Sequence, residues 1–254
     1  MSSGLKHCIV YMVYMGIDEI GLETLLVSQT YIQTKKRCLM LGRQQIFQTT
    51  HSINRILDKY GFKKLTHRYK KNEFIEQLLQ DLGFEEVDSL DYSKFEGATI
   101  LHDMNKPIQL EKRYDFIIDC GTTEHIFHVP QVFETIQTLL EVGGVFCSVV
   151  PNNNMSGHGM YQFSPEFFLS IFTEKYGMEL KELYIAVNPS PKDMWIDVNH
   201  RQGHGSRNCS SFPTQEQIYC IAIAKKISNN RKSLLTESPF QYSYEQVDWK
   251  EGMV

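Results

Sequence analysis

Four residues that can bind ligands directly follow apolar runs of the chain. Gly42 follows RCLML, Asp91 follows EEVDSL, Asp103 follows GATILH and Asp119 follows YDFII. A glycine lets the backbone approach a ligand closely, and the two carboxylate oxygens of Asp91 match the two hydroxyls of a ribose. Asp103 would lie near an adenine edge. Each of the three acids can equally cap a turn or end a strand. The evidence for a ligand-binding site is that such residues follow several apolar runs one after another.

Apolar periodicity predicts the elements that would position these residues. Continuous apolar runs predict strands at 37–41, 84–93, 97–103, 114–121, 144–152, 179–187 and 217–226. Helical spacing predicts helices at 44–61, 72–83, 130–144 and 164–177, after a mainly helical stretch up to residue 36. This alternation predicts an α/β fold with a mostly parallel, seven-stranded sheet and an antiparallel edge strand, because no helix separates the last two strands. Ligands of such sheets bind beyond the carboxyl ends of the strands.

Composition narrows the classes of protein that the chain can represent. The 254 residues are 42% apolar, and the formal net charge of −4 gives no basic excess, so no nucleic-acid partner is expected despite the basic run 63–71. No two of the six cysteines have C-x-x-C spacing, which argues for a reducing compartment. The apolar stretch near the N-terminus is too short to cross a bilayer. We expect a cytoplasmic protein with no membrane partner, organised as a helical segment (1–36), a main domain (37–228) and a tail (229–254).

The middle of the chain carries a succession of motifs that resembles a known family. The strand at 114–118 is followed by Glu124-His125, a helix at 132–140, Gly143-Gly144 and Pro151-Asn152. This order resembles the small-molecule branch of class I S-adenosylmethionine-dependent methyltransferases, which includes the ubiquinone-biosynthesis O-methyltransferases. SLDYS (89–93) is similar to their ribose segment, and YQFSPEFF (161–168) to a helix start of the same branch. LGRQ (41–44) is similar to the first motif of a narrower bacterial and viral group, and the resemblance covers roughly residues 37–226.

The resemblance implies a Rossmann-like, doubly wound fold and S-adenosylmethionine as the cofactor. The cofactor-binding residues that it implies are Leu41, Gly42, Arg43, Gln44, Asp91, Tyr92, His102, Asp103, Met104, Asp119, Cys120, Gly121 and Glu124. The first motif departs from the family, because Met40 occupies the acidic position and only Gly42 remains of three glycines. We expect Arg43 and Gln44 to hold the methionine end of the cofactor with their side chains. In a dinucleotide-binding fold an acid follows the glycines by about 20 residues, so the later Asp91 counts against a nicotinamide enzyme.

Methyl transfer to a hydroxyl needs a group that removes the hydroxyl proton, and histidine suits this near neutral pH. His125, His128 and His158 are candidates, with His158 expected as the base, His125 as a residue that shapes the site, and Asn153 and Tyr161 as further substrate contacts. The segment around His158 can equally be a flexible lid. His200 and His204 lack a helically spaced acid, so no metal is expected. The predicted function is O-methylation of a small molecule or sugar by a protein that can form a homodimer; the alternative is an inactive, methyltransferase-like binding protein.

Overall fold

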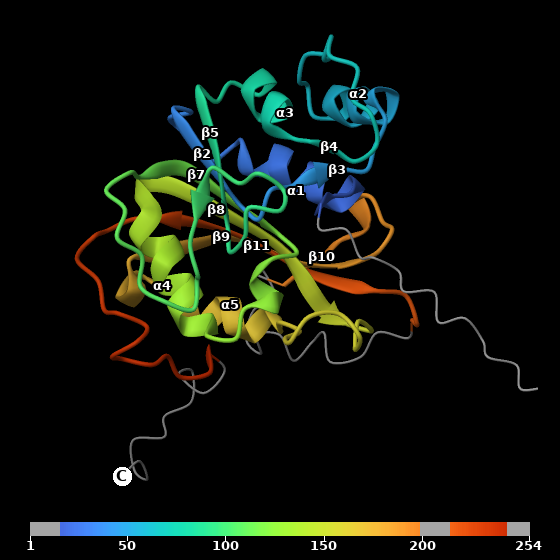
Figure 1. Cartoon of the computed structure of the whole chain (residues 1–254). Helices are drawn as coiled ribbons and strands as arrows, with labels where there is room; N and C mark the ends of the chain where they lie inside the picture. Colours follow the sequence, from blue (N-terminus) through green and yellow to red (C-terminus); the bar gives the residue numbers. More distant parts are fainter. Residues whose placement is uncertain (1–15, 199–213, 243–254) are drawn as a thin grey trace, which may run out of the picture.

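The protein is built around one eight-stranded sheet. The structure is a computed structural model and describes residues 16–198 and 214–242 (Figure 1). The order of strands across the sheet is β10 (Ile196–Asp197), β9 (Met178–Val187), β11 (Ile218–Lys226), β8 (Leu140–Asn153), β7 (Tyr114–Cys120), β2 (Arg37–Leu41), β5 (Glu86–Asp91) and β6 (Ile100–Leu101). Strands β8, β7, β2, β5 and β6 pair in parallel, whereas β11 is antiparallel to both β8 and β9.

This topology confirms the predicted α/β class and the mostly parallel sheet, with two differences in detail. The long antiparallel strand β11 lies inside the sheet, between β8 and β9, and not at its edge. The edge is formed by an eighth strand, β10, which pairs antiparallel with β9 and has only two residues. So short a strand has too few side chains to show an alternating pattern in the sequence.

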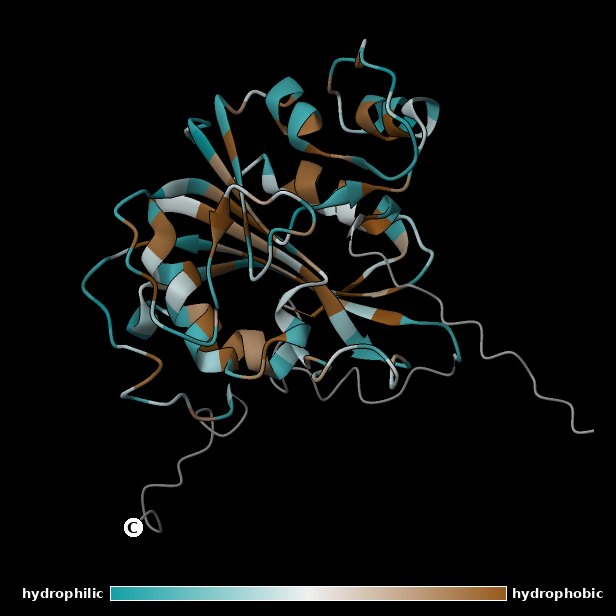
Figure 2. Cartoon of the chain, viewed as in Figure 1, coloured by the Kyte–Doolittle hydropathy of each residue, from teal (hydrophilic) through white to brown (hydrophobic). Residues whose placement is uncertain are grey.

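The helices cover both faces of the sheet. The helices α1 (Glu19–Ser28), α2 (Thr50–Lys59) and α3 (Glu76–Asp81) share one apolar core with the sheet, and α4 (Val129–Leu139) and α5 (Pro165–Ile171) share the other. The strands between them are strongly apolar (Figure 2). Cys38 and Met40 face the first core, and Leu39 and Leu41 face the second. Burial on both faces explains why this strand is a continuous apolar run.

Two predicted helices begin later than expected because short strands precede them. Gln45–Ile46 (β3) and Glu73–Phe74 (β4) pair with each other, and β3 also pairs with β1 (Gly16–Ile17). Helix α2 therefore starts at Thr50, where the side chain of Thr49 accepts a hydrogen bond from Ser52 N, and α3 starts at Glu76. The predicted helix at 164–177 is divided into α5 and the 3₁₀ turn η2 (Glu174–Tyr176). A further 3₁₀ turn, η3 (Lys192–Met194), precedes β10.

The parallel register brings the carboxyl ends of the central strands to one edge of the sheet. Leu41 pairs with Leu90 on one side and with Asp119 on the other, and Asp91 pairs with Leu101. The strand-end residues that the sequence singled out are therefore spatial neighbours.

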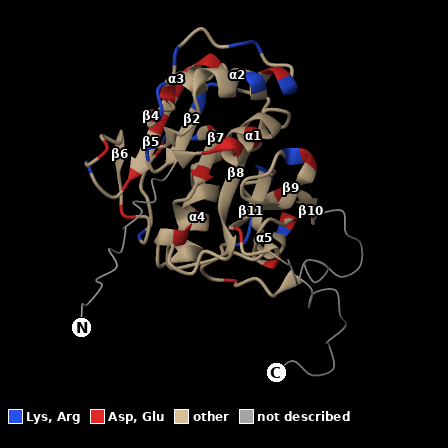
Figure 3. Cartoon of the chain, turned by 90° about the vertical axis from the view of Figure 1, so that its right-hand side faces the viewer, with Lys and Arg blue, Asp and Glu red and all other residues tan. Residues whose placement is uncertain are grey.

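Hydropathy and charge were compared with two expectations from the sequence, the lack of a membrane span and the basic run at 63–71. In residues 16–198 and 214–242 no helix combines the length and the apolar composition of a membrane span. The basic run 63–71 lies in the connection between α2 and β4, at one end of the molecule (Figure 3). The three-part domain division stays a prediction, and its first 15 and last 12 residues lie outside the described ranges, as do His200 and His204.

Candidate functional site

Two cavities open at the carboxyl edge of the parallel strands. The first, called here the Asp91 cavity, has a volume of about 360 Å³ and is lined by Leu90, Asp91, Tyr92, His102, Asp103, Met104, Asn105, Thr122, His125 and Ile126. The second, called here the His158 cavity, has a volume of about 250 Å³ and is lined by Gly16, Asp18, Gly21, Phe47, Cys120, Gly121, Glu124, Val149, Pro151, Met155, His158, Asn188, Gln217 and Tyr219. The turn after β7 contributes residues to both. Among the described residues, no Lys or Arg lines either cavity.

Two acids form turns at the Asp91 cavity. Asp91 Oδ1 accepts a hydrogen bond from Ser93 N at 2.8 Å. Asp103 Oδ1 accepts from the backbone and side-chain nitrogens of Asn105, at 3.1 and 2.9 Å, and these bonds, with Lys106 nearby, lower the pKa of Asp103. Both carboxyl groups therefore stabilise local turns while they line a cavity. The turn-forming and ligand-binding interpretations of these acids are compatible.

The segment after β2 is fixed to its neighbours by side chains. Gly42 has a φ of +67°, which favours glycine, and its N–H donates to Leu90 O at 2.8 Å. The carbonyl of Leu41 accepts from Gln44 Nε2 and from Thr122 Oγ1, both at 2.7 Å. Gln44 is fully buried, and its Oε1 has no hydrogen-bond partner among the described residues. This segment thus ties β2 to the turn after β7.

Arg43 has partners other than a ligand. Its Nε lies 2.6 Å from Glu76 Oε1, its Nη1 donates to Glu96 O at 2.7 Å, and its guanidinium carbon lies 3.9 Å from the centre of the Phe74 ring. An ion pair and a cation–π contact of this kind hold the side chain against α3 and β4. The geometry favours a structural role over the predicted fork for the cofactor carboxylate.

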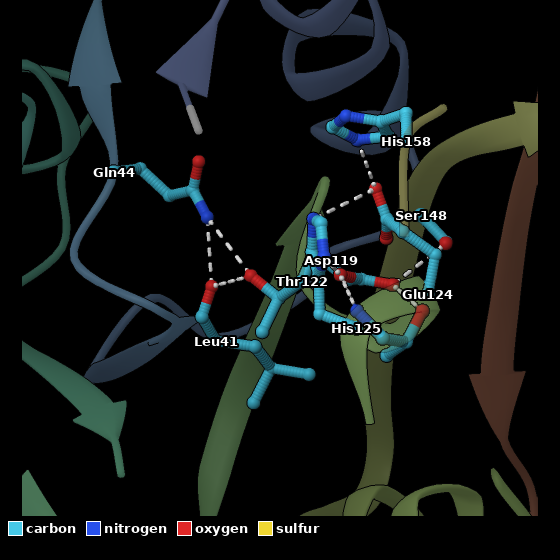
Figure 4. Close-up of polar contacts among 9 residues, drawn as sticks. Leu41, Gln44, Asp119, Thr122, Glu124, His125, Ser148 and His158 are labelled. Carbon is cyan, nitrogen blue, oxygen red and sulfur yellow. Dashed lines mark hydrogen bonds and ion pairs between the residues drawn. The ribbon is translucent and has the colours of Figure 1, made fainter. Parts of the chain in front are cut away.

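Glu124, His125 and His158 form a compact polar cluster between the two cavities (Figure 4). Glu124 lies in the 3₁₀ turn η1 (Thr123–His125) and is fully buried. Its Oε1 lies 3.1 Å from His158 Nε2 and 3.9 Å from His125 Nε2, and the two imidazole rings are 4.8 Å apart in an edge-on arrangement. Glu124 Oε2 is buried and has no hydrogen-bond partner among the described residues. Burial lowers the pKa of His125, Glu124 opposes this shift, and the nearby His158 adds to it.

The backbone around η1 holds this cluster in place. The N–H groups of Met160 and Tyr161 donate to the carbonyl of Glu124, at 2.8 and 3.2 Å. Gly159 has a φ of +70°, and a Cβ added there would lie 2.8 Å from Glu124 Cγ. The glycine is required twice, by its backbone angle and by the close approach of Glu124.

The carboxyl group of Asp119 accepts hydrogen bonds from the turn that carries Glu124 and His125. It is fully buried, and its Oδ1 accepts from the N–H groups of Thr122 and Thr123, at 3.1 and 3.2 Å. Its Oδ2 accepts from Thr123 Oγ1 at 2.7 Å and Ser148 Oγ at 3.0 Å (Figure 4). Burial, assisted by the charge of Glu124, raises the pKa of Asp119 to about 7. Asp119 therefore orders the turn that carries the cluster.

The structure brings most of the predicted site residues to the two cavities. The Asp91 cavity contains Asp91, Tyr92, His102, Asp103, Met104 and His125, and the His158 cavity contains Cys120, Gly121, Glu124 and His158. The predicted residues that line neither cavity are Leu41, Gly42, Arg43, Gln44, Asp119, Asn153 and Tyr161. Asn153 accepts from the N–H of Asn154, and the Tyr161 hydroxyl donates to Phe127 O. The binding roles of all these residues stay predictions.

The His158 cavity is also lined by residues that were not predicted from the sequence. Asp18, the N-cap of α1, accepts from Gly21 N at 2.8 Å, and burial raises its pKa. Asn188, Gln217 and Tyr219 come from the ends of β9 and β11. An Asp directly before an apolar run signals a helix cap, which was a usable sign for Asp18. The pattern of the chain held no sign that β11 would insert beside β8.

Comparison with known proteins gives structural likeness without close relatives. No protein-family model matches the chain, and no curated protein matches it. TehB from Haemophilus influenzae is 14% identical over 79% of this chain and 61% of that one, with a TM-score of 0.39. NodS, an N-methyltransferase from Bradyrhizobium japonicum solved with S-adenosylhomocysteine, is 10% identical over 81% and 86%, with a TM-score of 0.44. The 1,6-didemethyltoxoflavin N1-methyltransferase of Burkholderia thailandensis, also solved with S-adenosylhomocysteine, is 12% identical over 83% and 80%, with a TM-score of 0.43.

These likenesses do not by themselves assign a family or an activity. The chain spans about three fifths of the TehB chain, and all three identities are low. The function of the chain must therefore be inferred from the two cavities and the side chains that line them.

Proposed function

We propose that this protein is a methyltransferase that uses S-adenosylmethionine and methylates a hydroxyl of a small molecule or sugar. The observation that carries the proposal is the composition of the Asp91 cavity. Asp91 supplies carboxylate oxygens at the end of β5, where a ribose diol can bind, and Asp103-Met104 lie at the end of β6, where an adenine ring can bind.

The described side chains that line the two cavities narrow the class of nucleoside that we expect to bind. Among the described residues, no Lys or Arg lines either cavity, so neither offers the side-chain cations that commonly bind phosphate. S-adenosylmethionine has a ribose and an adenine but no phosphate, and its sulfonium is positively charged. Asp18 and Glu124 line the adjoining His158 cavity, where carboxyl groups suit a cationic centre better than an anionic one.

The cluster beside this cavity supplies the second requirement of the reaction, activation of the acceptor. Methyl transfer is an in-line displacement in which the acceptor oxygen bonds to the methyl carbon and the S–C bond breaks, leaving its electron pair on sulfur. The protein must hold both reactants in line and ionise the hydroxyl. His158 contacts Glu124 and lines the His158 cavity, and these two observations support its proposed role as the base for that hydroxyl.

Calorimetry with S-adenosylhomocysteine tests the proposal. Asp91→Asn removes the negative charge but keeps an oxygen for the N–H of Ser93. Loss of one hydrogen bond to a charged group costs about 1.5–3 kcal/mol, so the dissociation constant should rise roughly 10–150-fold. Asp58→Asn is the control, because Asp58 is exposed on α2 and lines neither cavity. No binding to the unmodified protein, or equal binding to Asp91→Asn, overturns the proposal, and binding of NAD(H) in its place would indicate a dehydrogenase.

A methyltransferase-like protein without activity is the second candidate. The observation in its favour is that Leu41, Gly42, Arg43 and Gln44 line neither cavity, so the segment after β2 makes less of the site than the resemblance implies. A thermal-shift measurement distinguishes the two candidate functions by whether the cofactor binds. A ligand that binds only the folded protein must raise its melting temperature, and failure of both S-adenosylmethionine and S-adenosylhomocysteine to do so would favour this second candidate.

A further inference from the structure

The three polar side chains between the two cavities are spaced like the ligands of a metal ion. One ligand atom from each of Glu124, His125 and His158 lies within 4.8 Å of the other two. Two of the separations are 3.1 Å, from Glu124 Oε1 to His158 Nε2, and 3.9 Å, from Glu124 Oε1 to His125 Nε2. Ligand atoms that each lie about 2.0–2.2 Å from a tetrahedral zinc ion are roughly 3.4 Å apart. The two separations that start from Glu124 Oε1 therefore lie on either side of the spacing expected around a cation.

We propose that Glu124, His125 and His158 bind a divalent first-row transition-metal ion such as Zn²⁺, which holds and ionises the methyl acceptor. The role given to the ion rests on the proposed methyl transfer, whereas the binding itself does not. The expectation from sequence that no metal is needed would then be wrong. It considered His200 and His204, and Asp119, Glu124 and His125 as neighbours along the chain, but not the contact of Glu124 with the distant His158.

The chemistry and the accessibility of the three side chains suit such an ion. Two imidazoles and one carboxylate form a mixed nitrogen and oxygen set that first-row divalent metals prefer over the all-oxygen set of Ca²⁺ or Mg²⁺. The Glu124 side chain is fully buried, that of His158 is 13% exposed and that of His125 is 38% exposed. The surrounding protein therefore holds Glu124 in place, while solvent and ligands can reach the two histidines. Three protein ligands leave coordination positions for a substrate. Glu124 Oε2, which lacks a partner among the described residues, belongs to the same carboxylate.

The open positions indicate the chemical class of the acceptor. Two neighbouring oxygens, as in the vicinal diol of an aromatic ring or a sugar, can both bind one cation. The ion would lower the pKa of the bound hydroxyl, as zinc does for bound water. The hydroxyl proton passes to solvent water, the oxygen bonds to the methyl carbon, and the electron pair of the broken S–C bond stays on sulfur. His158 then acts as a ligand of the ion and does not take the proton itself.

Binding of Zn²⁺ and Co²⁺ to the chelator-treated full chain tests this inference without any measurement of activity. The unmodified protein should bind one Zn²⁺ in calorimetry, and Co²⁺ should give visible absorption bands of a site with nitrogen and oxygen ligands. His158→Ala and His125→Ala should each weaken Zn²⁺ binding by more than about 100-fold, since loss of a second-shell partner alone costs 10–100-fold. His51→Ala is the matched control, because His51 is exposed on α2 and lines neither cavity.

The outcomes separate this inference from the proposed function. Zn²⁺ binding that is lost in both cluster variants and kept in His51→Ala supports the site. Equal Zn²⁺ affinity in all four proteins, or no binding to the unmodified chain, overturns it and leaves His158 as a base. Melting temperatures of the variants show whether each has folded, and two separate ligand variants keep the test decisive if one has not. Binding of S-adenosylhomocysteine to the chelator-treated protein is measured in parallel and reports on the cofactor alone.

Discussion

The substitution Gly159→Ala, which adds one methyl group, tests the placement of the loop that carries His158. In Gly159→Ala the new Cβ would lie 2.8 Å from Glu124 Cγ and 3.0 Å from the Glu124 carbonyl oxygen, on a backbone with a φ of +70°. The carbonyl cannot easily retreat, because it accepts hydrogen bonds from the N–H groups of Met160 and Tyr161. The Glu124 side chain is fully buried and contacts His158.

The expected loss of stability has two parts. A left-handed backbone costs a residue with a Cβ about 1–2 kcal/mol, and extra atoms in a well-packed site cost about 1–3 kcal/mol. The free energy of unfolding should therefore fall by about 2–5 kcal/mol. At about 2–4 °C per kcal/mol for a chain of this size, the melting temperature should fall by roughly 4–20 °C.

The matched control is Gly157→Ala in the same loop, where an added Cβ would meet no atom within 4 Å. Its melting temperature, measured by calorimetry beside that of Gly159→Ala, should stay close to that of the unmodified protein. If Gly159→Ala were as stable as Gly157→Ala, the loop would not pack on Glu124 as described, and the cluster of Glu124 and His158 would have to be abandoned.

Two further substitutions follow from the buried groups and from the segment after β2. Because the pKa of Asp119 is raised to about 7, the folded chain holds a proton that the unfolded chain releases near pH 4, and this stabilisation is lost as the pH rises through 7. Asp119→Asn cannot titrate, so urea unfolding should show the unmodified protein losing about 2 kcal/mol more than the variant between pH 5 and 8; parallel losses would refute the buried, protonated carboxyl. Arg43→Ala removes the contacts with Glu76 and Phe74. It should lower the free energy of unfolding by about 1 kcal/mol and change the affinity for S-adenosylhomocysteine by less than about threefold. A tenfold loss of affinity at unchanged stability would instead support the predicted cofactor-binding role of Arg43.

The fold was largely readable from the sequence because its signals are local. The apolar run at 37–41 is buried on both faces, and Pro130 lies in the first turn of α4, as the pattern predicts. What could not be read depends on pairing between distant segments. β10 has two residues, and β11 inserts beside β8 across more than sixty residues of chain. The strand Gln45–Ile46 pairs with β1 and β4, and no helical or alternating pattern in the sequence predicts this pairing.

The candidate site likewise has a part that local sequence signals indicated and a part that depends on contacts between distant segments. Asp91 and Asp103 were predicted together because strand ends of a parallel sheet meet at one edge. The structure places both on one cavity, and their binding roles stay predictions. The contact of His158 with Glu124 spans 34 positions of the sequence and depends on how one loop folds over η1. The sequence predicted that Arg43 contacts the cofactor, and the structure adds Glu76, 33 positions further along the chain, as its ion-pair partner. Side-chain partners contributed by distant elements are the part that a single sequence does not reveal.

A crystal structure of the chain grown with S-adenosylhomocysteine would show whether the Asp91 cavity binds the cofactor. We expect the ribose hydroxyls on the carboxylate of Asp91, the adenine beside Asp103 and Met104, and the sulfur facing the cluster of Glu124, His125 and His158. A nucleoside bound away from Asp91, or crystals in which both cavities remain without ligand at saturating S-adenosylhomocysteine, would contradict it.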